Sequence, residues 1–181
     1  MAEWWDLRDP DGEPIGQRYQ RGSAAPLPEG AFHLVSSVCA VRADGRVLIT
    51  RRAPGKTYPG EWEFPAGSAV SGEESRSAAV RELHEESGLA VAEADLVLVA
   101  RFVHGSEIFD LYAVSIPGDP VLALDPEEVD DAAWVTLYGL AARAAGVGGA
   151  GAPQMCGPWV RRLREQWQAL SSAVAAVQAS S

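Results

Sequence analysis

Hydrophobic and polar residues are distributed along the chain in a pattern that predicts β-hairpins at its start. Residues 3–9 and 15–22 flank the turn sequence PDGEP, which is typical of a hairpin. Residues 32–42 and 46–52 are rich in apolar and β-branched side chains and are separated by Ala-Asp-Gly, so they predict a second hairpin of mostly buried strands. Residues 53–67 are rich in Pro and Gly and are expected to cross the domain as an irregular segment.

A central helix is predicted to follow this segment. Ser71 or Gly72 is expected to cap its start, and Glu73 and Glu74 then lie in a first turn, where the helix dipole favours anions. Gly88 is a natural C-terminal cap, because glycine adopts the left-handed conformation that ends many helices.

The C-terminal half predicts further strands and a short helix. Strands are expected at residues 92–103 and 108–116, with a shorter one at 132–136. Thr136 would cap a brief helix that ends near residue 145, and residues 146–153, GVGGAGAP, are expected to be flexible.

A last helix is predicted from Pro158 to about Val177. Its apolar residues recur at helical spacing: Trp159, Leu163, Trp167, Leu170 and Val174. Covering the core of its own domain is the ordinary role of such an amphipathic helix, and a homodimer interface is the alternative.

Together these elements predict an α/β fold with a mixed sheet between helices. A chain of 181 residues suits a single domain with an extended end. We divide it into an N-terminal hairpin and loop (1–30), a core (31–145), and a linker with the C-terminal helix (146–181).

Composition limits the partners and the location of the chain. The formal net charge of −10 argues against DNA, because DNA binding draws its affinity from a basic surface. No apolar stretch approaches the roughly 20 residues of a membrane span, and the start has neither a basic leader nor an apolar signal core. Cys39 and Cys156 lie in dissimilar contexts and are expected to be reduced thiols, so a cytoplasmic location is predicted.

The central helix concentrates carboxylates on one face. Glu82, Glu85 and Glu86 stand at positions i, i+3 and i+4, where side chains converge. A solvated acidic face is the common explanation of such a run, but no lysine in this helix offsets the repulsion. Three oxygen ligands on a rigid element suit Mg²⁺ or Mn²⁺, and Arg81 can hold a carboxylate in place beside them.

The same stretch resembles the Nudix box at every defined position. The matching residues are Gly67, Glu73, Arg81, Glu82, Leu83, Glu85, Glu86, Gly88 and Leu89. The resemblance implies the Nudix fold, an α/β/α sandwich, and divalent-metal-dependent attack of water on a diphosphate linked to another group. It also implies that Glu82, Glu85, Glu86 and the carbonyl of Ala66 bind metal, while Arg81 and Glu73 orient this set.

The flanks of the box are similar to isopentenyl diphosphate isomerases, over residues 33–62, which makes isomerisation the first rival activity. Isomerisation requires a cysteine and a histidine in the loop before the helix. That loop has Ala66 and Ser68 at the corresponding places. His33 matches one histidine of the isomerase metal site but lacks its upstream partner, so a hydrogen-bonded strand histidine is favoured. A non-catalytic nucleotide-sensing module is the other alternative.

An additional acid from outside the box is expected to activate water. Glu107 aligns with a metal-binding glutamate of the isomerase branch, and Glu128 lies in the loop where some nucleotide hydrolases place theirs. We favour Glu107, then Glu128, although either fits an exposed loop acid. Glu82 could serve if it does not bind metal.

Three basic residues, Arg51, Arg52 and Lys56, concentrate positive charge around the start of the Pro- and Gly-rich segment and are expected to bind phosphate oxygens. Trp62 would line the cleft against a nucleobase or pack beneath it. The sequence therefore predicts a hydrolase dependent on Mg²⁺ or Mn²⁺ that acts on a small diphosphate substrate, expected to be a nucleotide. An isoprenoid diphosphate remains open.

Overall fold

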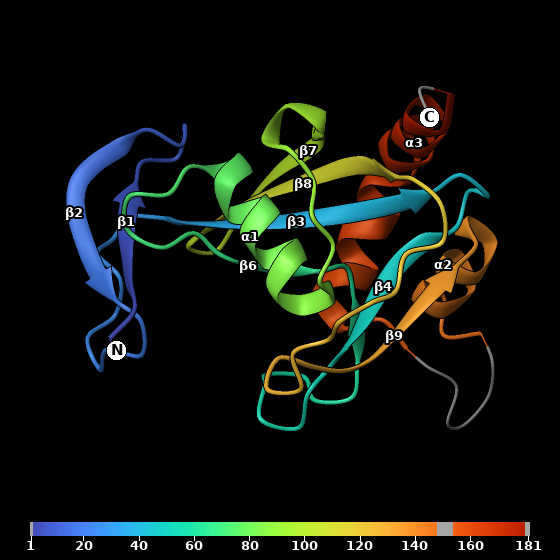
Figure 1. The fold of residues 1–181 in the computed structure, drawn as a ribbon. Coiled ribbons are helices and arrows are strands. Elements are labelled where there is room, and N and C mark those ends of the chain that lie inside the picture. Colours follow the sequence, from blue (N-terminus) through green and yellow to red (C-terminus); the bar gives the residue numbers. More distant parts are fainter. Residues whose placement is uncertain (1, 148–153, 180–181) are drawn as a thin grey trace.

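The computed structural model describes residues 2–147 and 154–179, which form a mixed sheet, a separate hairpin and three α-helices (Figure 1). The hairpin consists of β1 (Trp4–Arg8) and β2 (Pro14–Gln20). The strands of the main sheet are β3 (His33–Arg42), β4 (Val47–Arg52), β5 (Trp62–Glu63), β6 (Ala66–Ser68), β7 (Val97–His104), β8 (Glu107–Ile116) and β9 (Val129–Val135). The helices are α1 (Ser75–Ser87), the 3-10 turn η1 (Glu93–Asp95), α2 (Leu137–Ala144) and α3 (Gly157–Ala179).

Strand β3 is the centre of the sheet, and its two halves have different partners. It pairs along its whole length with β8 in parallel, whereas its other neighbours are antiparallel. On the other edge, residues 35–37 pair with β6, while Val41 pairs with Val47 of β4. Strands β4 and β6 therefore diverge from each other along β3, and β4 continues outward to β5 and β9.

Helices cover both faces of the sheet. Because side chains alternate along a strand, Val38 and Ala40 pack with Leu83 of α1, whereas Cys39 and Val41 face the opposite layer. That layer is built by α3 and α2, which lie behind the sheet when α1 is in front (Figure 1). The predicted α/β/α sandwich with a mixed sheet is confirmed.

Helix α3 packs on the core of its own domain. Its apolar side chains Trp159, Leu163, Leu170 and Val174 are buried against the sheet, while Gln166 has the non-helical angles φ −119° and ψ 18° that mark a kink. Within the described residues, no helix is both long and apolar enough to cross a membrane.

The predicted start of α1 was wrong. The helix begins at Ser75 with Glu74 as its N-cap, and Ser77 accepts a hydrogen bond from the Glu74 N–H (3.2 Å). Ser71 remains in the preceding loop because its hydroxyl donates to Asp6 of the hairpin (2.7 Å). Gly72 is held in the same way, because its N–H donates to the other oxygen of Asp6 (2.7 Å).

Several other boundaries also differ from the sequence prediction. The segment expected to be irregular contains β5 and β6, which are only two and three residues long and therefore leave no periodic pattern. Strand β7 starts later than predicted because residues 93–95 form η1, and β9 starts earlier, at Val129. The end of α1 at Gly88 and the Thr136 cap of α2 are confirmed. The predicted flexibility of residues 146–153 falls largely on residues 148–153, which lie outside the described residues.

The left-handed C-cap of α1 gives the first prediction. Gly88 has φ 74°, and a Cβ there would lie 2.8 Å from Cβ of Ala123, so Gly88→Ala adds a clash to the conformational cost. Gly72→Ala is the matched control, because Gly72 also has a positive φ (91°) but nothing within 4 Å. In urea unfolding we expect Gly72→Ala to lower the free energy of unfolding by about 1–2 kcal/mol. Gly88→Ala should lower it by more. Equal losses of stability in the two variants would contradict the packing of Gly88 on Ala123.

Candidate active site

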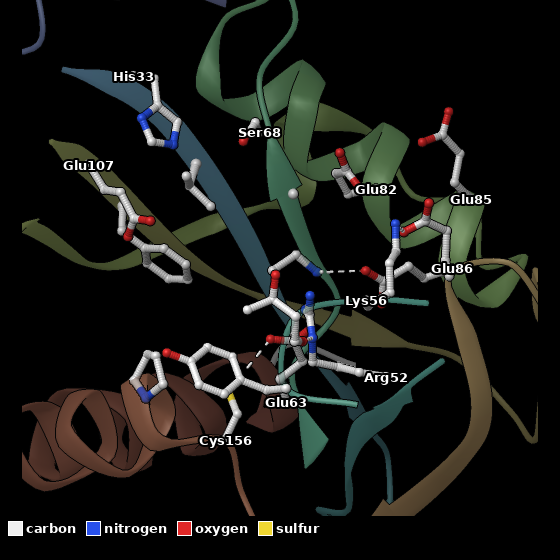
Figure 2. A pocket seen from close by; sticks show the side chains of 18 of the residues that line it. His33, Arg52, Lys56, Glu63, Ser68, Glu82, Glu85, Glu86, Glu107 and Cys156 are labelled. Carbon is white, nitrogen blue, oxygen red and sulfur yellow. Dashed lines mark hydrogen bonds and ion pairs between the residues drawn. The ribbon is translucent and has the colours of Figure 1, made fainter. Parts of the chain in front are cut away.

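A cavity of about 380 Å³ lies beside α1 and β6 and gathers most of the predicted site residues (Figure 2). The predicted residues that line it are Arg52, Lys56, Ala66, Arg81, Glu82, Glu85, Glu86, Glu107 and Glu128. Five glutamates, Glu63, Glu82, Glu85, Glu86 and Glu128, share the part of its lining that also holds Arg52, Lys56 and Arg81. We call this part the acidic end.

Glu86 bridges the point where β4 and β6 diverge. One of its oxygens accepts a hydrogen bond from Thr50 of β4 (3.0 Å), and the other accepts one from the Ala66 N–H of β6 (3.3 Å). The side chain is buried, and burial together with the nearby charge of Glu63 raises the pKa of Glu86 well above its ordinary value. Within the described residues, Glu86 is thus a buried carboxylate whose two oxygens are held by a hydroxyl and a backbone N–H.

Arg81 neutralises the carboxylates around it. Its guanidinium donates twice to Glu73 (2.8 Å each), and also to Glu82 (2.6 Å), Glu85 (2.9 Å) and the carbonyl of Ser68 (3.1 Å). These contacts, with Glu73 foremost, raise the pKa of Arg81. Burial nevertheless raises the pKa of Glu82. The arginine therefore fixes the geometry of the helix face.

The acidic end fits a divalent cation in its donor chemistry, since its carboxylate oxygens are the ligands that Mg²⁺ and Mn²⁺ prefer. Gly67 also fits, because a Cβ at this position would overlap with the Glu82 carboxylate, so only glycine lets that side chain reach the cavity. Within residues 2–147 and 154–179, however, no three acidic, His or Cys side chains already converge as a ligand set. Arg81 holds Glu82 and Glu85, and a cation would have to compete with it.

Glu63 is a cavity residue that the sequence prediction missed. It is buried and ion-paired with Arg52, and the Cys156 thiol donates to its carboxylate (3.7 Å). Burial raises the pKa of Glu63 and raises that of Cys156 to about 12. A charged residue between Trp62 and Phe64 was the only signal in the sequence, because the short strand β5 shows no periodicity.

Arg51 and Trp62 do not line the cavity. Successive side chains of a strand point to opposite faces, so Arg52 faces the site while Arg51 donates to Asp130 on the other side (2.6 Å). Trp62 is buried in the core cluster that contains Phe64. The structure therefore does not support the expected substrate contacts of these two residues.

Glu128 and Glu107 lie in different surroundings. Glu128 forms an ion pair with Lys56 and is close enough to Glu82 for its charge to raise the pKa of Glu82. Glu107 lies across the cavity beside His33, away from the helix glutamates (Figure 2). There it pairs with Arg162 of α3 (3.2 Å), a residue that the sequence did not suggest because its partner is 55 positions away.

The comparisons with known proteins agree with this geometry. The family model described as the NUDIX domain matches residues 31–150. An uncharacterized Nudix hydrolase of Listeria monocytogenes is 39% identical over 140 residues, which cover 74% of this chain and 80% of that protein. A protein of Clavibacter michiganensis subsp. michiganensis named isopentenyl-diphosphate Delta-isomerase is 35% identical over 141 residues, which cover 71% of this chain and 70% of that protein.

The fold has solved counterparts. A crystal structure of a Deinococcus radiodurans protein aligns with a TM-score of 0.72 and 23% identity, covering 91% of this chain and 99% of that one. Nudix enzymes act on small diphosphate substrates and generally use divalent metal ions. The matched domain, the relatives and the glutamate-lined cavity lead to one conclusion: this chain belongs to the Nudix family and is a Nudix hydrolase.

Proposed function

We propose that this enzyme uses Mg²⁺ or Mn²⁺ to hydrolyse a phosphoanhydride bond in a nucleoside diphosphate that carries another group, or in a similar diphosphate. The observation that carries this proposal is the position of Glu82, Glu85 and Glu86 around one cavity beside Gly67. When bound, a divalent cation neutralises phosphate charge and lowers the pKa of water. We further propose a cytoplasmic location; the homodimer stays a prediction, and the burial of Trp159 in its own core does not favour it.

The side chains that α1 contributes to the acidic end have proposed tasks. Glu82, Glu85 and Glu86 would hold the cation, and the carbonyl of Ala66 stays a proposed fourth ligand. Arg81 would act as a positioning residue, because it holds two of these glutamates and is anchored by Glu73.

Two basic side chains are available for the substrate. Arg52 and Lys56 line the cavity and are paired with Glu63 and Glu128, respectively. Because a phosphate oxygen is also an anionic acceptor, these cations can contact the diphosphate while they remain near their carboxylates. Arg52 and Lys56 therefore replace the wider set of three basic residues that the sequence suggested.

Glu128 is our proposed proton acceptor for the attacking water. Its charge acts on Glu82, so Glu128 lies near the proposed metal-binding glutamates, whereas Glu107 lies across the cavity from them (Figure 2). A general base must lie within reach of the proton that it removes. This order reverses the preference that the sequence alone suggested.

Removal of the carboxylate charge tests the metal-binding proposal. Glu85→Gln and Glu86→Gln are expected to lower kcat for phosphate release in Mg²⁺ by about 100-fold or more, because a neutral amide binds a divalent cation poorly. Glu93→Gln, an exposed acid outside the cavity, is the control and should retain the wild-type rate. Wild-type turnover in both cavity variants would eliminate the proposed mechanism.

The assignment of the base predicts a difference between neighbours. Glu128→Gln is expected to reduce kcat by about 100- to 10,000-fold with a small effect on KM. Glu127→Gln is the matched control, since Glu127 is exposed and does not line the cavity. Steady-state kinetics give kcat and KM for both variants. Wild-type activity of Glu128→Gln would show that another group is the base.

Isomerisation is a second candidate, favoured by the isomerase-named relatives at 34–36% identity. The structure adds one cavity thiol, Cys156, but burial and Glu63 raise its pKa, and the loop position is Ala66. We therefore expect no deuterium incorporation when the enzyme and isopentenyl diphosphate are incubated in heavy water and followed by mass spectrometry. Incorporation that disappears in Cys156→Ser would establish the isomerase activity instead.

A further inference from the structure

The N-terminal hairpin of β1 and β2 is bound to the loop that leads into α1 (Figure 1). Asp6 of β1 accepts one hydrogen bond on each carboxylate oxygen, from the Ser71 hydroxyl and from the Gly72 N–H (2.7 Å each). The Ser71 N–H also donates to the carbonyl of Trp4 (2.7 Å). The hydrogen bond from Ser71 lowers the pKa of Asp6, so this carboxylate is ionised at neutral pH. The first half of the loop is therefore fixed by the hairpin.

Arg8, the last residue of β1, contacts the second half of the same loop. Its guanidinium donates to the carbonyl of Glu73 (3.3 Å) and to the carboxylate of Glu74, the N-cap of α1 (3.1 Å). A third contact, to the carbonyl of Gly12 (2.9 Å), connects the guanidinium to the turn of the hairpin. Arg8 is buried, and its main chain exchanges two hydrogen bonds with Phe32 (2.9 Å each). The hairpin is thus fixed to the domain at the point where Arg8 contacts the loop.

We call Asp6 and Arg8 the hairpin clamp. Both residues lie before residues 31–150, the range that the family model matches. Neither is among the described residues that line the cavity. Any effect of the clamp on the reaction must therefore pass through the loop.

Glu73 connects the clamp to the acidic end of the cavity. Within the loop, the Val70 N–H donates to the Glu73 carboxylate (3.0 Å), and the Glu73 N–H donates to the carbonyl of Val70 (2.9 Å). The carboxylate also accepts from Nε and Nη2 of Arg81 (2.8 Å each). A planar bidentate pair of this kind depends on the relative position of both groups. A shift of the loop would therefore weaken the pair between Glu73 and Arg81.

The way in which Arg81 divides its donors determines how available the proposed metal ligands are. While Nε and Nη2 donate to Glu73, Nη1 is the donor that contacts Glu82 (2.6 Å) and Glu85 (2.9 Å). Those carboxylates are acceptors of the same kind as Glu73, so a guanidinium released from Glu73 would turn more of its donors to them. A cation would then compete against a stronger ion pair.

We infer that Asp6 and Arg8 are positioning residues of the active site. They fix the backbone of Glu73, and Glu73 holds the guanidinium of Arg81 away from a full pairing with the helix glutamates. The carboxylates that Arg81 contacts thereby stay available to the cation. This inference rests on the proposed function, because it assumes that the helix glutamates bind the cation.

Binding of Mn²⁺ alone, followed by isothermal titration calorimetry, tests the inference. Asp6→Asn keeps the shape of the side chain but removes one of its two acceptor oxygens, and Arg8→Met keeps the apolar stem but removes the donors. Each should weaken Mn²⁺ binding by about 10-fold, the lower end of the effect of losing an outer-shell partner. Arg18→Gln is the matched control and should bind Mn²⁺ like the wild type. Arg18 is an exposed residue that pairs with the same Asp6 (3.2 Å), and its loss leaves the contacts of Asp6 with the loop in place.

Kinetics distinguish positioning from a loss of stability. With ADP-ribose, a nucleoside diphosphate that carries a sugar, as the probe, both clamp variants should show a kcat about 10-fold lower at limiting Mg²⁺. KM should change little, because Arg52 and Lys56 belong to β4 and the segment after it. Saturating Mg²⁺ should restore the wild-type kcat, which a general weakening of the fold would not allow.

A double-mutant cycle tests the route through Glu73. Glu73→Gln should weaken Mn²⁺ binding by about 10- to 100-fold, because it removes the charged partner of Arg81. Adding Asp6→Asn to Glu73→Gln should weaken it no further, since both substitutions act on the same contact. Losses that add in the double variant would overturn the inference.

The remaining outcomes separate the clamp from the proposed function. Wild-type Mn²⁺ affinity in both clamp variants would overturn the inference, whatever their stability in urea, and Asp6→Asn decides alone if Arg8→Met does not fold. Mn²⁺ affinities in the expected order without hydrolysis of any diphosphate would support the clamp and refute the proposed reaction. A wild-type enzyme that binds no Mn²⁺ would refute both.

Discussion

The repulsion among the five glutamates at the acidic end of the cavity is the constraint on which the site depends. Three basic side chains, Arg52, Lys56 and Arg81, offset it through ion pairs with Glu63, Glu128 and the helix glutamates, respectively. Glu86 differs from the others because its oxygens contact a hydroxyl and a backbone N–H instead of a cation. A buried charge held only by neutral donors is costly, so Glu86 gains most from any cation that enters the cavity.

This electrostatic arrangement requires the unusual pairing of β3. Glu86 can reach Thr50 and Ala66 together only because β4 and β6 pair with different halves of one strand and separate beside the helix. Leu83 packs α1 on the sheet and thereby sets the distance between the sheet and the acidic face of the helix. Gly67 then leaves the space that the Glu82 carboxylate fills. The strand pairing that defines the fold therefore also positions the residues of the site.

The parts predicted from sequence are those encoded by local spacing. The intervals among Glu82, Glu85 and Glu86 place them on one helical face in any fold, and Gly88 ends the helix wherever it packs. Position in the cavity depends on tertiary contacts, which local patterns do not contain. Arg51 and Arg52 are equivalent in the sequence, and only the pairing of β4 decides which one faces the cavity.

The same distinction explains why the grouping of His33, Glu107 and Arg162 was missed although His33 and Glu107 were both singled out. Their relation arises from the parallel register of two strands 74 positions apart, and Arg162 joins them from a helix beyond residues 148–153. Four of the eight residues of the acidic end, Arg81, Glu82, Glu85 and Glu86, come from α1, whereas His33, Glu107 and Arg162 come from three separate elements. Local spacing could therefore place half of the acidic end, but none of the contacts among His33, Glu107 and Arg162.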